Sequence, residues 1–409
     1  MTASAAGAAT TGRAEAILTL NAGSSSIRFA VYEAAYPVRR SWSGKLDQLG
    51  RTDAKLLVQG AAAAPPVPAC CAGDLSATAR WLVDWLLDRL PVDALRAVGH
   101  RVVHGFTASE PQWVDEALLQ QLHALEPYDP EHLPLELQLI QEVRERRPEL
   151  AQLACFDTAF HHDMPLVAQM LPIPRRYHAR GVRRYGFHGL SFQHLMEALR
   201  HIGDPAASEG RVVLAHLGNG ASVAAVRDGR SIDTSMALTP AAGLVMGSRS
   251  GDLDPGLFGF LARTEQMTVE QFANLINRES GMLGISELSA DMRELLQLAP
   301  RDERAAQAVE VFCYQARKWI AAMAAALGGI DLLVFSGGIG ENVPVVRERI
   351  CDGLGFLGVG VDHARNQAGE PIISPDPADV RVRVIATDEE LMIAQQVYAR
   401  WAAALDFRH

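Results

Sequence analysis

The apolar residues of this chain form short runs typical of strands, separated by longer stretches with the spacing of helices. Near the start, the runs ILTL and IRFAVYE flank the polar turn NAGSSS, and this order predicts a β-hairpin over residues 16–33. Residues 211–235 have the same order of apolar strand, Gly/Asn/Ser turn, second strand and polar turn. Such self-similarity suggests a duplicated domain. Because both segments are short, chance explains the similarity equally well at this point.

Helical spacing of apolar residues dominates much of the remaining chain. It predicts helices over residues 75–90, 115–125, 135–146, 269–276, 304–327 and 343–354 and in the C-terminal segment. Further apolar runs predict buried strands in AVGHRVVHG, LACFDTAFHH, IDLLVFSGG and RVRVIAT. Strands that alternate with helices indicate the α/β class. The residues after the first hairpin, including AAAAPPVP, are predicted to be a weakly structured surface connection.

Chain length, charge and cysteine content narrow the class of protein. At 409 residues the chain exceeds one ordinary core, so we expect two domains with a cleft between them. The formal net charge of −10 argues against binding to nucleic acid or anionic membrane through a general basic field. Five cysteines form neither a CxxC metal pattern nor an even disulfide set, which favours a reducing compartment. We therefore expect a cytoplasmic protein without nucleic-acid or membrane partners.

The sequence predicts neither a secretory signal nor a membrane span. Residues 1–14 lack the apolar run of a secretory signal, so we expect a disordered tail there. The longest apolar stretch, residues 319–335, is interrupted by two glycines and an aspartate and is shorter than the roughly 20 residues that span a bilayer.

Three turns rich in glycine or serine follow apolar strands, at residues 21–26, 216–222 and 336–342. Small residues let the backbone approach an anion closely, and N–H groups and hydroxyls supply donors without bulk. Each turn alone is more often an ordinary connection, but three in one chain favour a nucleotide cleft. No GxxxxGK[ST] motif is present, so a P-loop is excluded and the phosphates would be held from two hairpins.

Cationic and acidic side chains gather in four further loop segments. Their sequences contain GHRVVHG, CFDTAFHH, RRYGFHG and GSRSGDLD. Phosphoryl transfer needs cations around the phosphate oxygens and a metal between phosphates, and Arg101, His188 and Arg249 have the required chemistry. A single Arg or His in a loop is usually solvated or a helix cap, and spacing alone does not bring these segments together.

At this point the segments match a known family in order. NAGSSSIRF, GHRVVHG, CFDTAFH, RRYGFHG, HLGNGASV, FSGGIGEN and ATDEELMIA together cover residues 16 to 394, and the block DTSMALTPAAGLVMGSRSGDLDPG is highly specific. The chain closely resembles the acetate kinase family, the acetate and propionate kinases within the larger group of sugar kinases, Hsp70 and actin.

The resemblance implies an α/β fold of two duplicated ribonuclease-H-like (actin-like ATPase) domains, with the active-site cleft between them. Residues 15–159 would form the N-terminal domain, joined by the C-terminal helix 393–409, and residues 160–392 would form the nucleotide-binding domain. It also implies a homodimer, ATP or ADP and a small carboxylate as substrates, and Mg²⁺ or Mn²⁺ as cofactor.

Site residues follow from the motif match, position by position. Arg101, Asp157, His188 and Arg249 would be catalytic, and Arg101, Val103 and Pro240 would bind the acid. Asn21 and Glu389 would serve the metal, with Ser24 and Ser26 in the phosphate loop. The nucleotide-binding set implied by the resemblance is Arg28, His216, Gly218, Asn219, Gly220, Asp291, Met292, Arg293, Gly338, Ile339, Gly340 and Asn342. A carboxylate acceptor has no proton for a base to remove at neutral pH, so we expect Asp157 to orient Arg101 or a metal-bound water.

Several positions depart from the family pattern. EPYDPEHLP, residues 126–134, replaces a segment that usually contains Leu-His-Asn-Pro, and Arg28 stands where Lys is common. Phe106, Leu190, Phe192 and Asp388 also differ from the usual residues. The expected activity is reversible, direct in-line transfer from ATP to acetate. The alternatives are a propionate or butyrate kinase of the same fold, a nucleotide-binding paralogue without catalysis, and an actin-like or Hsp70-like ATP-driven binding module, which has no need of the two arginines.

Overall fold

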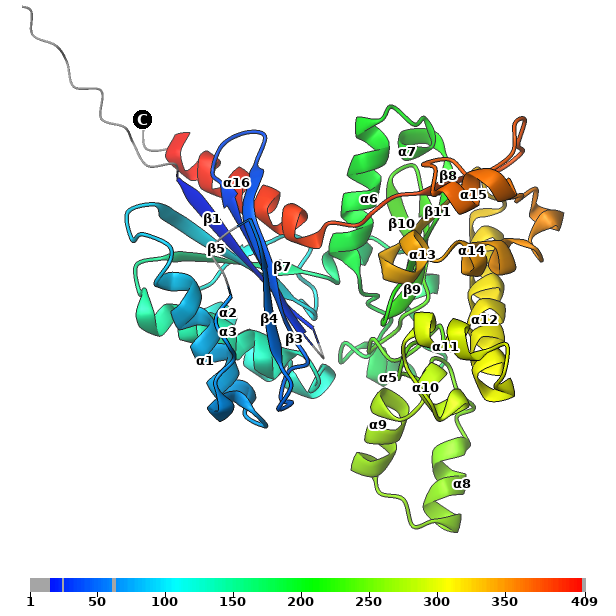
Figure 1. The fold of residues 1–409 in the computed structure, drawn as a ribbon, viewed down its shortest axis with the longest axis horizontal. Coiled ribbons are helices and arrows are strands. Elements are labelled where there is room, and N and C mark those ends of the chain that lie inside the picture. The colour runs from blue at the N-terminus through cyan, green and yellow to red at the C-terminus, as the bar shows by residue number, and fades with distance from the viewer. Residues whose placement is uncertain (1–14, 24–25, 61–63, 407–409) are drawn as a thin grey trace, which may run out of the picture.

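The computed structural model describes residues 15–23, 26–60 and 64–406, and it has two lobes, each built on one β-sheet (Figure 1). The sheet of the first lobe has seven strands in the order β4-β3-β2-β1-β5-β7-β6. Their bounds are β1 Ala16–Ala22, β2 Ser26–Glu33, β3 Arg39–Asp47, β4 Lys55–Gln59, β5 Leu95–Val102, β6 Gln112–Trp113 and β7 Ala151–Phe156. Strands β1 to β4 are antiparallel, whereas β5 pairs in parallel with both β1 and β7.

The second lobe repeats this topology. Its sheet has the order β10-β9-β8-β11-β12, with antiparallel pairing from β10 to β8 and parallel pairing from β8 to β12. The strands are β8 Arg211–Leu217, β9 Ala221–Arg227, β10 Arg230–Thr234, β11 Leu332–Ser336 and β12 Arg381–Val384. Order and direction match those of β3-β2-β1-β5-β7, which confirms the α/β class and the duplicated ribonuclease-H-like topology.

Helices cover both faces of each sheet. In the first lobe they are α1 Leu75–Leu87, α2 Glu116–Ala124, α3 Leu133–Arg146 and α16 Glu389–Asp406. The longer helices of the second lobe are α6 Gly189–His201, α8 Leu257–Thr264, α9 Val269–Arg278, α12 Glu303–Leu327 and α14 Pro344–Cys351. Of these, α6 and α12 pack on the sheet, whereas α8 and α9 project away from it (Figure 1). Shorter helices are α4 Leu166–Gln169, α5 Arg175–His178, α7 Ala206–Glu209, α10 Gly281–Ser286, α11 Met292–Leu298, α13 Gly337–Asn342 and α15 His363–Ala368. None in the described ranges is both long and apolar enough to cross a membrane.

The cores show why these sequences form these elements. Helix α12 buries a face rich in alanine, which lets it lie close to β8 and β9 in the largest apolar cluster. Helix α16 packs on β1 and β5, and a β-carbon at Gly99 of β5 would overlap Ile393 and Val397 of this helix. A side chain at that position would therefore displace the last helix of the chain.

The residues after the first hairpin are more regular than their pattern predicts. They contain β3 and β4, which extend the sheet beside β2. Most residues of β3 are exposed or half-buried, so its sequence lacks the apolar alternation of a strand with one buried face. Backbone pairing with β2, which the pattern does not encode, forms this strand.

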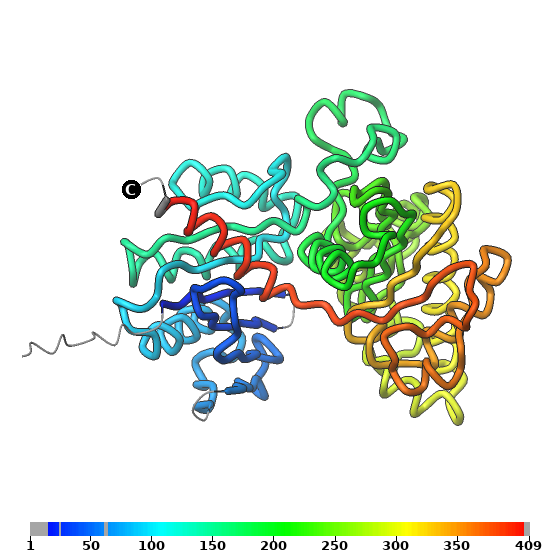
Figure 2. The backbone as a smooth tube through the Cα atoms, turned by 90° about the horizontal axis from the view of Figure 1, so that it is seen from above, coloured from blue at the N-terminus to red at the C-terminus, as the bar shows by residue number. Residues whose placement is uncertain are grey.

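The chain crosses twice between the lobes. One crossing follows β7, and the other is the extended segment between β12 and α16, which Figure 2 shows running from the second lobe back to the first.

Because three histidines are buried, we predict that acid destabilises this fold. Burial lowers the pKa of His100, His104 and His161 to about 4 in each case, below the value of about 6.5 in an unfolded chain. As pH falls from about 6.5 to 4, the unfolded chain takes up protons that the folded chain does not bind, so the free energy of unfolding falls by up to about 1.4 kcal/mol per pH unit for each histidine.

Urea unfolding at a series of pH values measures this effect. His100→Gln is expected to reduce the slope of the unfolding free energy against pH by the contribution of one histidine. His201→Gln, at the exposed end of α6, should leave this slope unchanged. Equal slopes for His100→Gln and the unmodified protein would contradict the assignment.

Candidate active site

A cavity of about 270 Å³ lies between the lobes, where strands of both sheets end. Most of the site residues inferred from sequence line it: Asn21, Ser26, Arg28, Arg101, Val103, His188, His216, Gly218, Asn219, Gly220, Pro240, Arg249, Gly338 and Glu389. Ser24 lies outside the described residues. The hairpins β1–β2 and β8–β9 thus both contribute residues to the lining of one cavity.

Arg101, near the end of β5, is held by a buried carboxylate. Its Nε and one terminal nitrogen donate to Asp157 Oδ2 at 3.0 and 2.5 Å, and its other terminal nitrogen donates to the carbonyl of Ala22 at 2.9 Å. Asp157 is fully buried directly after β7. Burial raises the pKa of Asp157, and the guanidinium opposes that shift. Asp157 therefore fixes the direction in which Arg101 presents its charge.

Arg249 reaches the same cavity from the second lobe, and a residue of the first lobe holds it. One terminal nitrogen lies 3.1 Å from His132 Nε2, and the other donates to the carbonyl of Pro240 at 3.2 Å. A guanidinium can only donate, so His132 Nε2 accepts. His132 Nδ1 then carries the proton, which it donates to Asp129 at 2.9 Å. Burial raises the pKa of Asp129, but the hydrogen bond from His132 and the nearby His132, Arg249 and His104 together outweigh this, and the net shift is downward.

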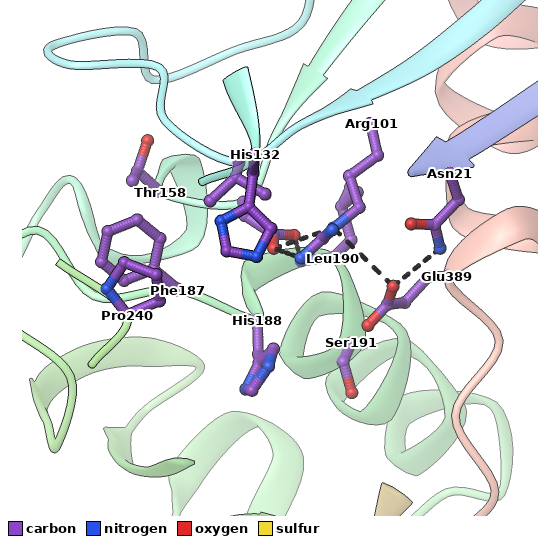
Figure 3. A network of polar contacts seen from close by, with 12 residues as sticks. Asn21, Arg101, His132, Thr158, Phe187, His188, Leu190, Ser191, Pro240 and Glu389 are labelled. Atoms are coloured by element: carbon purple, nitrogen blue, oxygen red, sulfur yellow. Dashed lines mark hydrogen bonds and ion pairs between the residues drawn. The ribbon is translucent and has the colours of Figure 1, made fainter. Parts of the chain in front are cut away.

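Figure 3 shows Arg101 and His132 side by side above His188, with Phe187 and Pro240 together at one edge of the site. Val103, Phe187 and Pro240 give this edge an apolar lining within the cavity. Two cations, one from each lobe, thus meet beside a small apolar notch, which suits a short acid with a carboxylate at one end.

Two imidazoles lie against each other, at a tilt of 30°, beside the N-terminus of α6. The rings of His188 and His216 lie 4.3 Å apart between centroids. Their Nδ1 atoms are 2.9 Å from Ser222 Oγ and 2.8 Å from Ser191 Oγ, respectively. Burial lowers the pKa of both rings. His216 and the nearby arginines add to the shift in the pKa of His188, whereas Glu389 and Glu341 oppose the shift in the pKa of His216. His188 has a φ of 60°, which is uncommon for a residue with a side chain and marks local strain at the site.

Asn21 and Glu389 lie on the other side of Arg101 in Figure 3. The Asn21 amide nitrogen donates to Glu389 Oε2 and Glu390 Oε1, both at 2.9 Å. Burial raises the pKa of Glu389, but Arg101, His216 and Asn21 together produce a net downward shift, so this carboxylate is ionised. In the part of the chain that the structure describes, no cluster of three or more His, Cys, Asp or Glu could hold a metal. Any cation here would have few protein ligands.

The remaining residues of the inferred nucleotide set do not line this cavity. Asp291 caps α11 and pairs with the exposed Arg293 at 2.5 Å, and Met292 is buried in the core. Ile339, Gly340 and Asn342 belong to α13, where a turn was predicted. Their place beside an adenosine stays a prediction.

Sequence reasoning missed the residues that hold the arginines and imidazoles in place. Asp129, His132, Ser191 and Thr387 were not named as site residues, and neither was Phe187, which lines the cavity. The available signal was the His-x-Pro of EPYDPEHLP, which keeps two residues of the family's Leu-His-Asn-Pro.

Two lobes of the same topology, with cations and glycine turns meeting at the strand ends, define a phosphotransferase of the actin-like ATPase fold. The sequence profile of the Acetokinase family matches residues 16–395. The chain therefore belongs to the acetokinase family.

Named relatives agree over nearly the whole chain. The acetate kinase of Methylocella silvestris is 41% identical over 396 residues, covering 94% of this chain and 97% of the relative. Among solved structures, a propionate kinase from Francisella tularensis has a TM-score of 0.86 at 36% identity, covering 93% of this chain and 98% of the other. The acetate kinase of Porphyromonas gingivalis has a TM-score of 0.80 at 32% identity, with coverage of 94% and 99%.

Proposed function

We propose that this protein transfers the γ-phosphoryl group of ATP to acetate, giving acetyl phosphate and ADP, in a reversible and direct in-line step. The observation that carries the proposal is that Arg101 and Arg249, borne by different lobes, line one cavity. The acetate kinases among the relatives support the choice of acid.

The geometry supports different roles for the polar residues. Arg101, oriented by Asp157, and Arg249, oriented by His132, would neutralise the acceptor carboxylate and the migrating phosphoryl group. His188 would donate to the same oxygens, and the glycine turn at 218–220 would cradle the polyphosphate with its N–H groups. Acetate is already ionised at neutral pH, so Asp157 is assigned no role as a base.

We include Mg²⁺ as the cofactor, held by Asn21 and Glu389. The Asn21 amide nitrogen donates to two carboxylates, which leaves oxygen atoms of Asn21 and Glu389 as possible metal ligands. Mg²⁺ prefers oxygen ligands and usually keeps several waters. When bound, it supplies positive charge between the phosphate groups. A homodimer and a cytoplasmic location complete the proposal and rest on the resemblance to the family.

Propionate is the second candidate acceptor. The Francisella tularensis propionate kinase has the higher TM-score of the two structures compared above, and residues 126–134, which supply His132 to the cavity, depart from the family pattern. An ATP-driven binding module has no use for two arginines held at an apolar notch, so it is set aside.

An acyl hydroxamate assay tests the function. Protein, Mg-ATP and hydroxylamine are incubated with formate, acetate, propionate or butyrate, and hydroxylamine traps any acyl phosphate. We expect kcat/KM to be highest with acetate and to fall by about 10-fold for the added methylene of propionate. A maximum at propionate would favour the second candidate. ATP hydrolysis at a rate independent of every acid would refute both.

A further inference from the structure

Two hydroxyl groups form a chain behind His216. Thr387 Oγ1 donates to Ser191 Oγ at 2.8 Å, and Ser191 Oγ lies 2.8 Å from His216 Nδ1. The three residues come from distant parts of the chain, namely the crossing segment before α16, the first turn of α6 and the end of β8. Figure 3 shows Ser191 between His188 and Glu389.

The direction of these hydrogen bonds determines which nitrogen of His216 carries the proton. Ser191 is fully buried, and its oxygen already accepts from Thr387. The Ser191 proton is satisfied only if it is donated to His216 Nδ1, because a buried donor without a partner is costly. His216 Nδ1 therefore accepts, and the neutral ring carries its proton on Nε2.

The Nε2 side of His216 faces the cavity. A β-carbon built on Gly218 would lie 3.7 Å from this nitrogen and 3.8 Å from the backbone nitrogen of Gly338. His216 and both glycines line the cavity. An N–H at Nε2 of His216 would point to where an anion held beside Gly218 and Gly338 would lie. A bare lone pair on this nitrogen would repel that anion.

Thr387 is itself fixed in place. Its backbone N–H donates to Glu341 Oε1 at 3.0 Å, and the same oxygen accepts from the N–H of Gly337 at 2.9 Å. Two residues further along, Glu389 pairs with Asn21 of the first lobe. The Thr387 hydroxyl thus has a defined position relative to the turn after β11 and to both lobes.

We propose that Thr387 and Ser191 are positioning residues that hold neutral His216 with its proton on Nε2, so that it donates to the phosphates of a bound nucleotide. This inference rests on the proposed function only in taking a nucleotide phosphate as the anion. Neither residue touches the phosphates in this proposal, since both act through His216. The charged and titratable groups that influence His216 are Glu389, Glu341, Arg28, Arg101 and His188.

The test compares Thr387→Val, Ser191→Ala and Thr387→Ser with the unmodified protein. Long-range ¹H–¹⁵N spectra of the histidine-labelled protein report the tautomer of His216. We expect the Nε2–H tautomer in the unmodified protein and in Thr387→Ser, and a mixture of tautomers in Thr387→Val and Ser191→Ala. A hydroxyl that donates to Nδ1 stabilises the neutral ring, so the pKa of His216 is expected to rise in Ser191→Ala.

Nucleotide binding supplies the second readout. By calorimetry, the Kd for ADP is expected to rise about 10-fold in Thr387→Val, the effect of weakening one hydrogen bond to a charged group, and to return to the original value in Thr387→Ser. Thr264→Val, at an exposed position of α8, is the matched control with an unchanged Kd. Because ADP binding needs no acid substrate, these results are independent of whether acetate is the acceptor.

Three results would overturn the inference: an Nδ1–H tautomer in the unmodified protein, an unchanged tautomer and Kd in Thr387→Val, or equal losses in Thr387→Val and Thr387→Ser. If Ser191→Ala does not fold, the two variants at half-buried Thr387 decide the question by the same criteria.

Discussion

Arg249→Ala is expected to lower kcat by about 10²- to 10³-fold, the usual effect of deleting one preorganised donor to a transition-state oxygen. His132 and the Pro240 carbonyl hold the Arg249 guanidinium in place, so it is positioned in advance for the phosphoryl group. The fold should survive the change, since His132 keeps its hydrogen bond to Asp129 and the Pro240 carbonyl borders the cavity.

Turnover by the hydroxamate assay and thermal unfolding measure the two halves of this prediction. Arg249→Lys keeps the charge but loses the planar fork, so an intermediate rate is expected. Arg301→Ala, at an exposed site of the same lobe, is the control and should behave as the unmodified protein does. A folded Arg249→Ala variant with a near-normal rate would remove Arg249 from the reaction.

Arg101→Ala is expected to reduce both activity and stability. Its side chain is largely buried against Asp157, which is fully buried. Removing the cation leaves an uncompensated carboxylate in the interior, a change that typically costs about 3–5 kcal/mol of unfolding free energy. The loss of one of the two cleft arginines should also lower kcat by at least about 10²-fold.

A double variant separates these effects. In Arg101→Ala/Asp157→Asn the buried charge is gone, so urea unfolding should recover most of the lost stability while turnover stays low. Arg96→Ala is the matched control, because Arg96 lies in the same strand in an exposed pair with Glu15, and its removal should cost less than about 1 kcal/mol. The interpretation fails if Arg101→Ala unfolds at the same urea concentration as the unmodified protein or if the double variant regains turnover.

Local patterns in the sequence correspond closely to many of the observed elements. The hairpin predicted at 16–33 is β1 and β2, and the helix predicted at 304–327 is α12, which begins one residue earlier at Glu303. Strict period-two or helical spacing arises where one face of an element is buried, so those segments can be recognised without a structure. The partly exposed β3 and the short helix α13 lack that signal, and both were missed as elements.

The sequence by itself determined the class of fold, the glycine turns and the kinds of side chain available for chemistry, and the resemblance in its motifs identified the family. Only the tertiary structure decided that Arg101 and Arg249 meet in one cavity, that His132 of one lobe orients the arginine of the other, and that Thr387 and Ser191 stand behind His216. The physical reason is that periodicity records which face of an element is buried, whereas hydrogen bonds between distant segments depend on how the lobes pack.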